Sequence, residues 1–241
     1  MNASKQVPRA FQWLRATALL LLIALPVAVI AVRLGAWQAG LLLYAAACLL
    51  GALLLAVCVI LALLPRNREQ RQPLQHGAML ALPGAVLLAV TLAGRGDNPP
   101  IHDISTDLEQ VPQFTRAPAL RGTDANSLAS SAETRAQQRQ GYPGLGPLLT
   151  EVEPSAAWER ALATARAMGW EITYEGPRQR RLEAVATTPI MGFKDDIIIR
   201  LQAVPEGTRI DLRSVSRVGV SDLGANAARI HAFQQAFQTG R

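Results

Sequence analysis

The chain has 241 residues, of which 50% are hydrophobic and 17% charged, and its formal net charge is +6. Residues 1–100 contain 8 of the 24 basic residues and 2 of the 18 acidic ones, so the rest of the chain has 16 of each and is neutral. The length allows one or two folding units. Because the excess positive charge flanks apolar runs, it is interpreted as a membrane topology signal, and nucleic-acid binding is not predicted.

Three apolar runs predict three N-terminal transmembrane α-helices, over residues 16–32, 39–64 and 74–93. About 20 apolar residues cross the 30 Å hydrocarbon core of a bilayer, so the third run is short for a span if it begins at Gly77 rather than at Leu74. Trp13 and Trp37 stand at span ends, where interfacial aromatic residues are common. Residues 1–97 are therefore predicted to be a membrane region, with the lipid bilayer as a partner.

The basic residues that flank the spans predict the orientation. Three precede the first span, one follows it, three lie between the second and third spans, and one follows the third: Lys5, Arg9, Arg15, Arg33, Arg66, Arg68, Arg71 and Arg95. This pattern predicts a multi-pass inner-membrane protein with a cytoplasmic N-terminus and a periplasmic C-terminal domain, if the cell is a Gram-negative bacterium. A cleaved signal peptide ending near residues 29–31 is an alternative that leaves the domain on the same side.

Residues 98–241 read as a soluble extracytoplasmic domain. Residues 94–112 are interpreted as an extended segment on the domain surface, residues 116–141 as a loop with a weak helix over 127–140, and residues 142–147 as a turn-rich connector. Apolar periodicity then predicts, in order, a helix, four strands and a final helix: Pro154–Met168, Trp170–Tyr174, Arg181–Thr188, Asp196–Val204, Thr208–Val218 and Asp222–Gln238.

Short turns between the strands favour hairpins, and the last strand shows two distinct faces. Ile210 and Leu212 alternate with Arg209, Asp211 and Arg213, which predicts one buried and one solvated face. The fold class that follows is an α+β domain, with an antiparallel four-stranded sheet and both helices on one face.

Several stretches resemble the domain of unknown function 1499 family. They are Asn98–Asp107, Tyr142-Pro143 with Pro147-Leu148, Gly192–Asp196, Arg213–Gly219, and Ser221–Gly224 with Asn226, Arg229 and Ile230. The resemblance covers residues 98–241 and implies a soluble domain that often follows membrane spans, but it implies no activity. Gly144 departs from the acidic residue that the resemblance leads us to expect after the Tyr-Pro pair.

No catalytic, metal or cofactor site is predicted. His102, Asp103, Asp107 and Glu109 include metal-ligand types, but their spacing matches no metal motif, and Asp103 or Asp107 is interpreted as a turn cap. Adjacent Asp195 and Asp196 are expected to point to opposite faces of a strand, so they are not expected to act together as an acid–base pair.

The two cysteines, Cys48 and Cys58, both lie in the second span, so residues 98–241 have no disulfide or thiolate zinc site. Ser214, Ser216 and Ser221 lack a Gly-x-Ser-x-Gly motif.

The predicted binding residues surround the turn between the last strand and the last helix. They are Arg213, Arg217, Ser221, Asp222, Asn226 and Arg229. The last three of these follow helical spacing, and a helix expected to start at residues 221–222 would offer its free backbone amides to an anion. The structural alternative is that Asp222 caps the helix while Asn226 and Arg229 fix the turn.

The predicted function is a binding or scaffolding module at the cell envelope, with an unknown envelope protein, polymer or lipid as partner. The alternative is an envelope hydrolase that uses polar residues of residues 98–241. A small transporter is less favoured, because the three spans contain no acidic or basic residue that would mark a substrate path.

Overall fold

The computed structural model describes residues 8–240, so the predicted topology residue Lys5 lies outside the described part. The chain divides into two compact units, Met1–Gly94 and Arg95–Arg241. Each unit has hydrophobic clusters of its own, so the second unit has a separate core.

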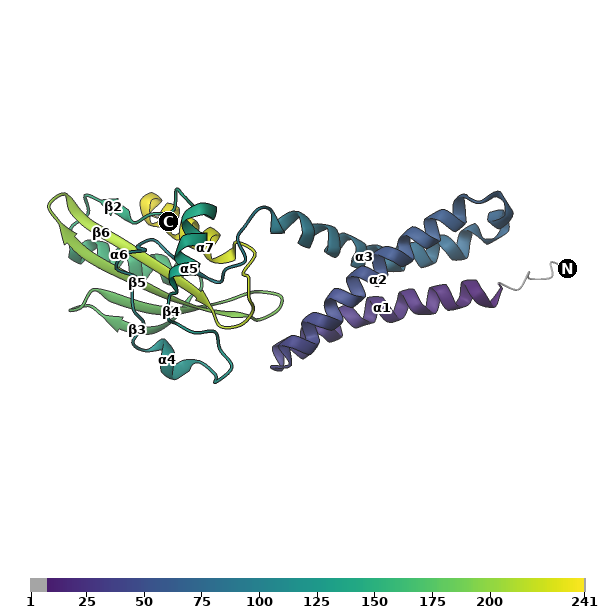
Figure 1. The fold of residues 1–241 in the computed structure, drawn as a ribbon, viewed down its shortest axis with the longest axis horizontal. Coiled ribbons are helices and arrows are strands. Elements are labelled where there is room, and N and C mark those ends of the chain that lie inside the picture. Colours follow the sequence, from purple (N-terminus) through teal and green to yellow (C-terminus); the bar gives the residue numbers. More distant parts are fainter. Residues whose placement is uncertain (1–7, 241) are drawn as a thin grey trace. The chain divides into compact units, whose positions relative to one another are not determined.

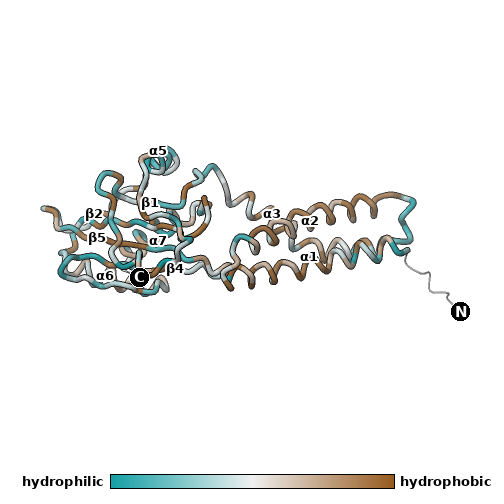
Figure 2. Tube along the Cα trace, turned by 60° about the horizontal axis from the view of Figure 1, so that its bottom comes forward, coloured by the Kyte–Doolittle hydropathy of each residue, from teal (hydrophilic) through white to brown (hydrophobic). Residues whose placement is uncertain are grey.

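The first unit contains three long helices and a short 3₁₀ helix. They are α1 (Arg9–Arg33), α2 (Trp37–Leu63), η1 (Pro65–Gln70) and α3 (Arg71–Arg95). Three helical segments are long and apolar enough to cross a membrane: Arg9–Arg33, Trp37–Leu63 and Pro65–Gly94. Apolar residues predominate along them (Figure 2). The three predicted apolar helices are therefore confirmed. Helices α1 and α3 extend past both ends of their predicted spans, whereas α2 begins two residues before its predicted span and ends one residue before the predicted end.

Small residues set the helix packing in this unit. A Cβ on Gly51 of α2 would lie 3.4 Å from the Cα of Gly84 in α3, so the two backbones approach closely. Cys48 and Cys58 are buried free thiols, as expected for small packed residues.

The second unit is built on an antiparallel sheet of six strands, ordered β1-β6-β5-β4-β3, with β2 also paired to β6. The strands are β1 (Asp103–Ser105), β2 (Leu148–Thr150), β3 (Glu171–Gly176), β4 (Arg181–Thr187), β5 (Lys194–Val204) and β6 (Gly207–Ser216). The last four form the predicted meander, with ends shifted by one or two residues.

The prediction of four strands was wrong because β1 and β2 have only three residues each. Such strands are too short for an alternating pattern, and their pairing with β6 depends on contacts distant in sequence. Ile101 and Ile104 were expected on the surface but are 3% and 0% exposed, within the core.

The main helices cover one face of the sheet. The helices of this unit are α4 (Ala117–Leu120), α5 (Ala132–Gly141), α6 (Pro154–Ala167) and α7 (Ala225–Thr239). Buried side chains of α6 and α7, among them Trp158 and Phe233, share one core with alternate strand residues: Leu182, Ala184, Ala186, Ile197, Ile199, Leu201, Ile210 and Leu212. This confirms the predicted layer of helices on one face (Figure 1).

The opposite face of the sheet is not solvated as predicted. Asp211 and Arg213, whose side chains alternate with the core residues of β6, are both 0% exposed. Backbone groups of Pro112, Thr115 and Leu128 bond to side chains of this face, so the segment between β1 and α5 covers it. The alternation identified two faces correctly, but Asp and Arg can be buried when they are paired.

We expect residues 98–241 to fold without the membrane helices, because they contain a complete core. Circular dichroism of this fragment should give one cooperative thermal transition. Phe233 is fully buried and stacks on Trp170 with ring centroids 5.5 Å apart. Phe233→Ala should therefore lower the free energy of unfolding by about 3–5 kcal/mol, whereas Leu149→Ala, at a 67% exposed position, should change it by less than about 0.5 kcal/mol. A fragment that aggregates or melts without cooperativity would contradict this expectation.

Candidate functional site

The six predicted binding residues divide between the two faces of the sheet. Arg213 and Arg217 point toward the segment that covers the second face, where they pair with Asp103 and Asp196. Asn226 and Arg229 lie on the helix side and both contact Ser214. The six side chains therefore do not line one groove.

On the helix side, Asn226 is the centre of a buried hydrogen-bond network. Its side chain is 0% exposed, accepts a bond of 2.6 Å from the Ser214 hydroxyl and donates one of 2.9 Å to Ser216 Oγ. It also donates to the His102 carbonyl at 3.1 Å. Arg229 bonds to Ser214 Oγ at 3.0 Å and forms an ion pair with Asp195. Such buried polar groups require these partners, which supports the structural alternative for Asn226 and Arg229.

Asp222 satisfies free backbone amides ahead of α7. Its carboxylate accepts from the amides of Gly224 at 2.8 Å and Asn226 at 2.9 Å. Burial raises the pKa of this carboxyl, although the two amides partly offset the rise. The predicted helix start at Asp222 was wrong, since α7 begins at Ala225. Leu223 and Gly224 have φ values of 54° and 88°, a left-handed conformation that cannot continue a right-handed helix. Ser221 Oγ accepts from the Leu223 amide at 3.2 Å.

The second face of the sheet carries a balanced set of charges, here named the ionic layer: Asp103, Asp107, Glu183, Asp196, Asp211, Arg121, Arg200, Arg209, Arg213 and Arg217. Arg213 donates to both oxygens of Asp103, at 2.9 and 2.8 Å, and to the carbonyls of Pro112 and Leu128. The guanidinium also lies over the Phe114 ring, 5.3 Å from its centroid. Each of the three guanidinium nitrogens therefore has at least one acceptor.

Neighbouring members of the ionic layer are paired in the same way. The Asp196 carboxylate forms ion pairs with the guanidinium groups of Arg217, at 2.7 Å, and Arg121, at 3.3 Å, and thus bridges the two. Burial lowers the pKa of Arg121, whose Nε and Nη1 lack hydrogen-bond partners among the described residues. Glu183 is 1% exposed and accepts from the backbone amides of Thr115, Arg116 and Ala117.

Asp195 and Asp196 face opposite ways, as their adjacency in a strand predicted. Asp195 pairs with Arg229 on the helix side, and Asp196 pairs with Arg217 in the ionic layer. The sheet itself separates these two carboxylates, so they do not act together as an acid–base pair.

The four residues considered as metal ligands also take separate partners. The His102 ring contacts the Val220 carbonyl, Asp103 pairs with Arg213, and Glu109 pairs with Arg139 at the surface. Asp107 accepts from the amides of Glu109 and Gln110, which confirms it as a turn cap. Within residues 8–240, no three His, Cys, Asp or Glu side chains are grouped so that they could hold a metal ion.

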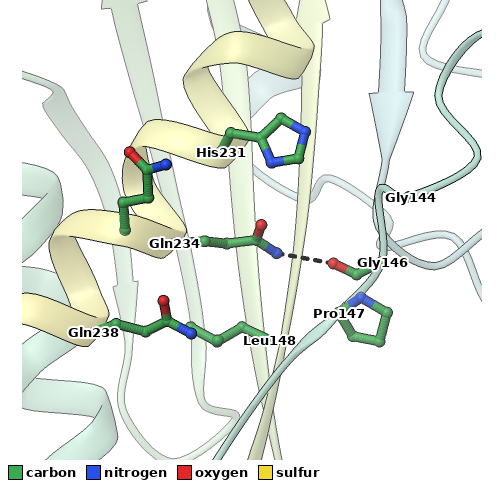
Figure 3. A pocket seen from close by; sticks show the side chains of 8 residues that line it. Gly144, Gly146, Pro147, Leu148, His231, Gln234 and Gln238 are labelled. Atoms are coloured by element: carbon green, nitrogen blue, oxygen red, sulfur yellow. Dashed lines mark hydrogen bonds between the residues drawn. The ribbon is translucent and has the colours of Figure 1, made fainter.

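One accessible site that the sequence reasoning missed is a polar cleft between α7 and residues 144–148, with a volume of about 360 Å³. Figure 3 shows His231, Gln234 and Gln238 on the helix opposite Gly146 and Pro147. Gln234 Nε2 donates to the Gly146 carbonyl at 2.8 Å. The lining, here named the α7 cleft, consists of Gly144, Gly146, Pro147, Leu148, His231, Gln234, Gln235 and Gln238.

Helical spacing explains how the α7 cleft forms. Residues 231, 234, 235 and 238 follow the i, i+3, i+4, i+7 pattern, which puts them on one face of α7. This polar stripe adjoins the apolar stripe of Ile230, Phe233 and Phe237, and it is the sequence pattern from which the helical side of the cleft could have been predicted. Gly144 supplies no side chain where the family resemblance leads us to expect an acid, and the lining contains no carboxylate or guanidinium.

The fold and its polar sites define a chain of three apolar helices followed by an α+β domain whose buried charges are internally paired. Residues 103–237 match the family described as protein of unknown function (DUF1499), and the chain belongs to this family. The predicted resemblance is thus confirmed over more than half of the chain. A search of the curated proteins gave no match.

Asp107 should make the stability of residues 98–241 fall in acid. Burial alone would raise the pKa of Asp107, but the amides of Gln110 and Glu109 and the guanidinium of Arg200 outweigh it and hold the pKa below 3.8. The unfolded chain, with a carboxyl pKa near 3.9, takes up this proton before the folded chain does. The contribution of Asp107 is therefore present above about pH 4 and is lost as the pH falls through the lower folded pKa.

Urea denaturation of this fragment at several pH values tests the expectation. Asp107→Asn should cost about 1–3 kcal/mol at neutral pH and should show a shallower loss of stability below about pH 4. Glu109→Gln is the control, because its carboxylate belongs to a surface pair and its side chain is 83% exposed. It should change stability by less than about 0.5 kcal/mol. The same acid dependence in Asp107→Asn and the wild type would contradict the assignment.

Proposed function

We propose that this protein is a multi-pass inner-membrane protein whose C-terminal domain is a binding module on the outer side of that membrane. Three helices of sufficient length and apolarity support the membrane part. The distribution of basic residues before, between and after them supports a cytoplasmic N-terminus and a periplasmic domain.

The α7 cleft carries the proposal of binding. Its volume of about 360 Å³ falls within the range of ligand sites. The glutamine amides both donate and accept hydrogen bonds, the imidazole can do the same, and the lining contains no Asp, Glu, Lys or Arg. Such a site suits a neutral chain rich in hydroxyl or amide groups, so the partner class is an envelope polymer or a protein segment rather than a charged metabolite.

Binding is favoured over the alternative of an envelope hydrolase. Ser214 and Ser216 are buried and bonded to Asn226, so neither hydroxyl is open to a substrate. No described serine forms a hydrogen bond with a histidine that could activate it. A role in binding for Arg213, Arg217, Ser221, Asp222, Asn226 and Arg229 stays a prediction, and their internal bonds give each of them a structural role as well.

The topology is tested by fusions to the C-terminus of the full chain. An alkaline phosphatase fusion should be active, because the enzyme folds only outside the cytoplasm, and a green fluorescent protein fusion should be dark. Fusions after Arg68, in the loop expected inside, should give the reverse pattern. An active phosphatase after Arg68 with an inactive one at the C-terminus would contradict the orientation.

The ligand class is tested by photocrosslinking in cells. A benzophenone amino acid at Gln235, in the α7 cleft, should yield an adduct whose mass spectrum contains sugar or peptide fragments. His231→Ala and Gln238→Ala should reduce this adduct several-fold, since each removes hydrogen-bonding groups from the lining, without lowering the melting temperature. Gln202 is an exposed glutamine of β5 outside the cleft, and Gln202→Ala should have no effect. Equal adduct yields from a photoprobe at Gln202 would contradict a specific site.

A further inference from the structure

The start of the second unit is fixed against the turn that precedes α7. Asn98 Nδ2 donates to the Leu223 carbonyl at 3.2 Å, and the Asp222 amide donates to the Ile101 carbonyl at 3.1 Å. A Cβ on Gly224 would lie 2.7 Å from Asn98 Nδ2, so the two segments are in close contact. The chain is thus held at this turn as soon as it joins the domain.

The length of chain between the third apolar helix and this turn is very short. Helix α3 ends at Arg95, three residues before Asn98. Three residues span at most about 11 Å when fully extended. Wherever α3 leaves a membrane, the turn at residues 220–224 must therefore lie close to that membrane surface.

This same end of the sheet exposes apolar side chains. The loop after β6 and the hairpin between β4 and β5 both project from it (Figure 1). Val220 is 78% exposed, Ile190 67% and Leu223 45%, three of the five large apolar side chains exposed in residues 96–240. Exposed apolar residues are ordinary when scattered, but here all three lie at one end of the sheet, and Leu223 adjoins the attachment of the chain at Asn98.

The loop after β6, which presents Val220 and Leu223, is firmly held. Asn126 Nδ2 donates to the Gly219 carbonyl at 2.8 Å, and the His102 ring contacts the Val220 carbonyl at 3.3 Å. Leu223 has a φ of 54°, a left-handed conformation that is uncommon for a leucine and costs energy. The structure thus fixes an exposed valine and a strained leucine in place, where a polar residue or glycine would be easier to accommodate.

We infer that this end of the domain rests on the bilayer, with Ile190, Val220 and Leu223 inserted among the lipid headgroups. The interfacial region of a bilayer is several ångströms deep on each side, which matches the reach of the short connection. The inference rests on the proposed membrane insertion of α3 and adds a second contact with the same membrane. It places β2 and the hairpin between β5 and β6 at the end farther from the lipid.

Fluorescence quenching of the full chain in lipid nanodiscs tests the inference. In a Cys48→Ala, Cys58→Ala background, single cysteines carry an environment-sensitive fluorophore at Val220→Cys, Leu149→Cys or Leu50→Cys. Leu149 is the matched control, because it is 67% exposed in β2, which pairs with the opposite end of β6. Leu50 is a 49% exposed residue of α2 and reports on membrane insertion itself. The quenchers are lipids with shallow or deep nitroxides, and aqueous iodide.

We expect the shallow nitroxide lipid to quench the label at residue 220 several-fold more than the label at residue 149. Iodide should quench the label at residue 220 less than the label at residue 149. Leu223→Asn should weaken the lipid quenching at residue 220, because asparagine tolerates the left-handed conformation but removes the apolar side chain. Leu149→Asn should leave it unchanged.

The other outcomes are distinguishable. If the deep nitroxide quenches the label at residue 50 while residue 220 behaves like residue 149, the helices are inserted and the bilayer contact is wrong. If residue 50 is quenched only by iodide, the proposed membrane insertion fails, and this inference fails with it. Equal lipid quenching at residues 149 and 220 would also overturn it, since no particular end would then face the lipid.

Discussion

A buried guanidinium needs fixed acceptors around it, and Arg213 obtains them from segments far apart in the sequence. Asp103 of β1, the carbonyl of Pro112 and the carbonyl of Leu128 all bond to this one side chain. Removing a charge from water costs several kcal/mol unless such partners compensate it. The short strand β1, the covering segment and the central strand β6 are therefore linked through a single residue, which has the largest of the fully buried side chains.

This use of charge separates structure from recognition. The Asp and Arg side chains that the sequence suggested as binding or catalytic residues are mostly bonded within the ionic layer or the network around Asn226. The side-chain hydrogen-bonding groups that line the α7 cleft are amides and an imidazole, which are suited to weak, neutral recognition. In this domain, the residues most typical of catalytic sites are those that hold the fold together.

The sequence allowed the meander and the two main helices to be predicted, because each has enough residues to display its period. It did not allow β1 or β2 to be predicted, since three residues have no period and their partner strand lies more than fifty residues away. The second face of the sheet was expected to be solvated because Arg209, Asp211 and Arg213 are typical surface residues. Asp211 and Arg213 are instead buried, and their burial depends on pairing across the fold, which no local pattern contains.

The candidate site residues likewise include some whose role the local sequence predicts and others whose role depends on distant contacts. The role of Asp222 was anticipated, because a carboxylate near a helix start usually binds free amides. Arg213 and Asn226 do not line one groove, because the sheet lies between them. Helical spacing alone does not show on which face of the sheet a helix packs. The α7 cleft was missed because His231 and three glutamines read as an ordinary solvated stripe until residues 144–148 are placed opposite them.

The short connection at Arg95 also limits what the domain can reach. If α3 spans a membrane as proposed, only residues 96 and 97 separate the end of this helix from Asn98, whose side chain is bonded to the domain. A small domain has a diameter of roughly 30 Å, so every point on its surface stays within a few tens of ångströms of the lipid. The proposed ligand of the α7 cleft would therefore be bound close to the membrane surface. This geometric limit favours a partner anchored in, or lying directly over, the same membrane.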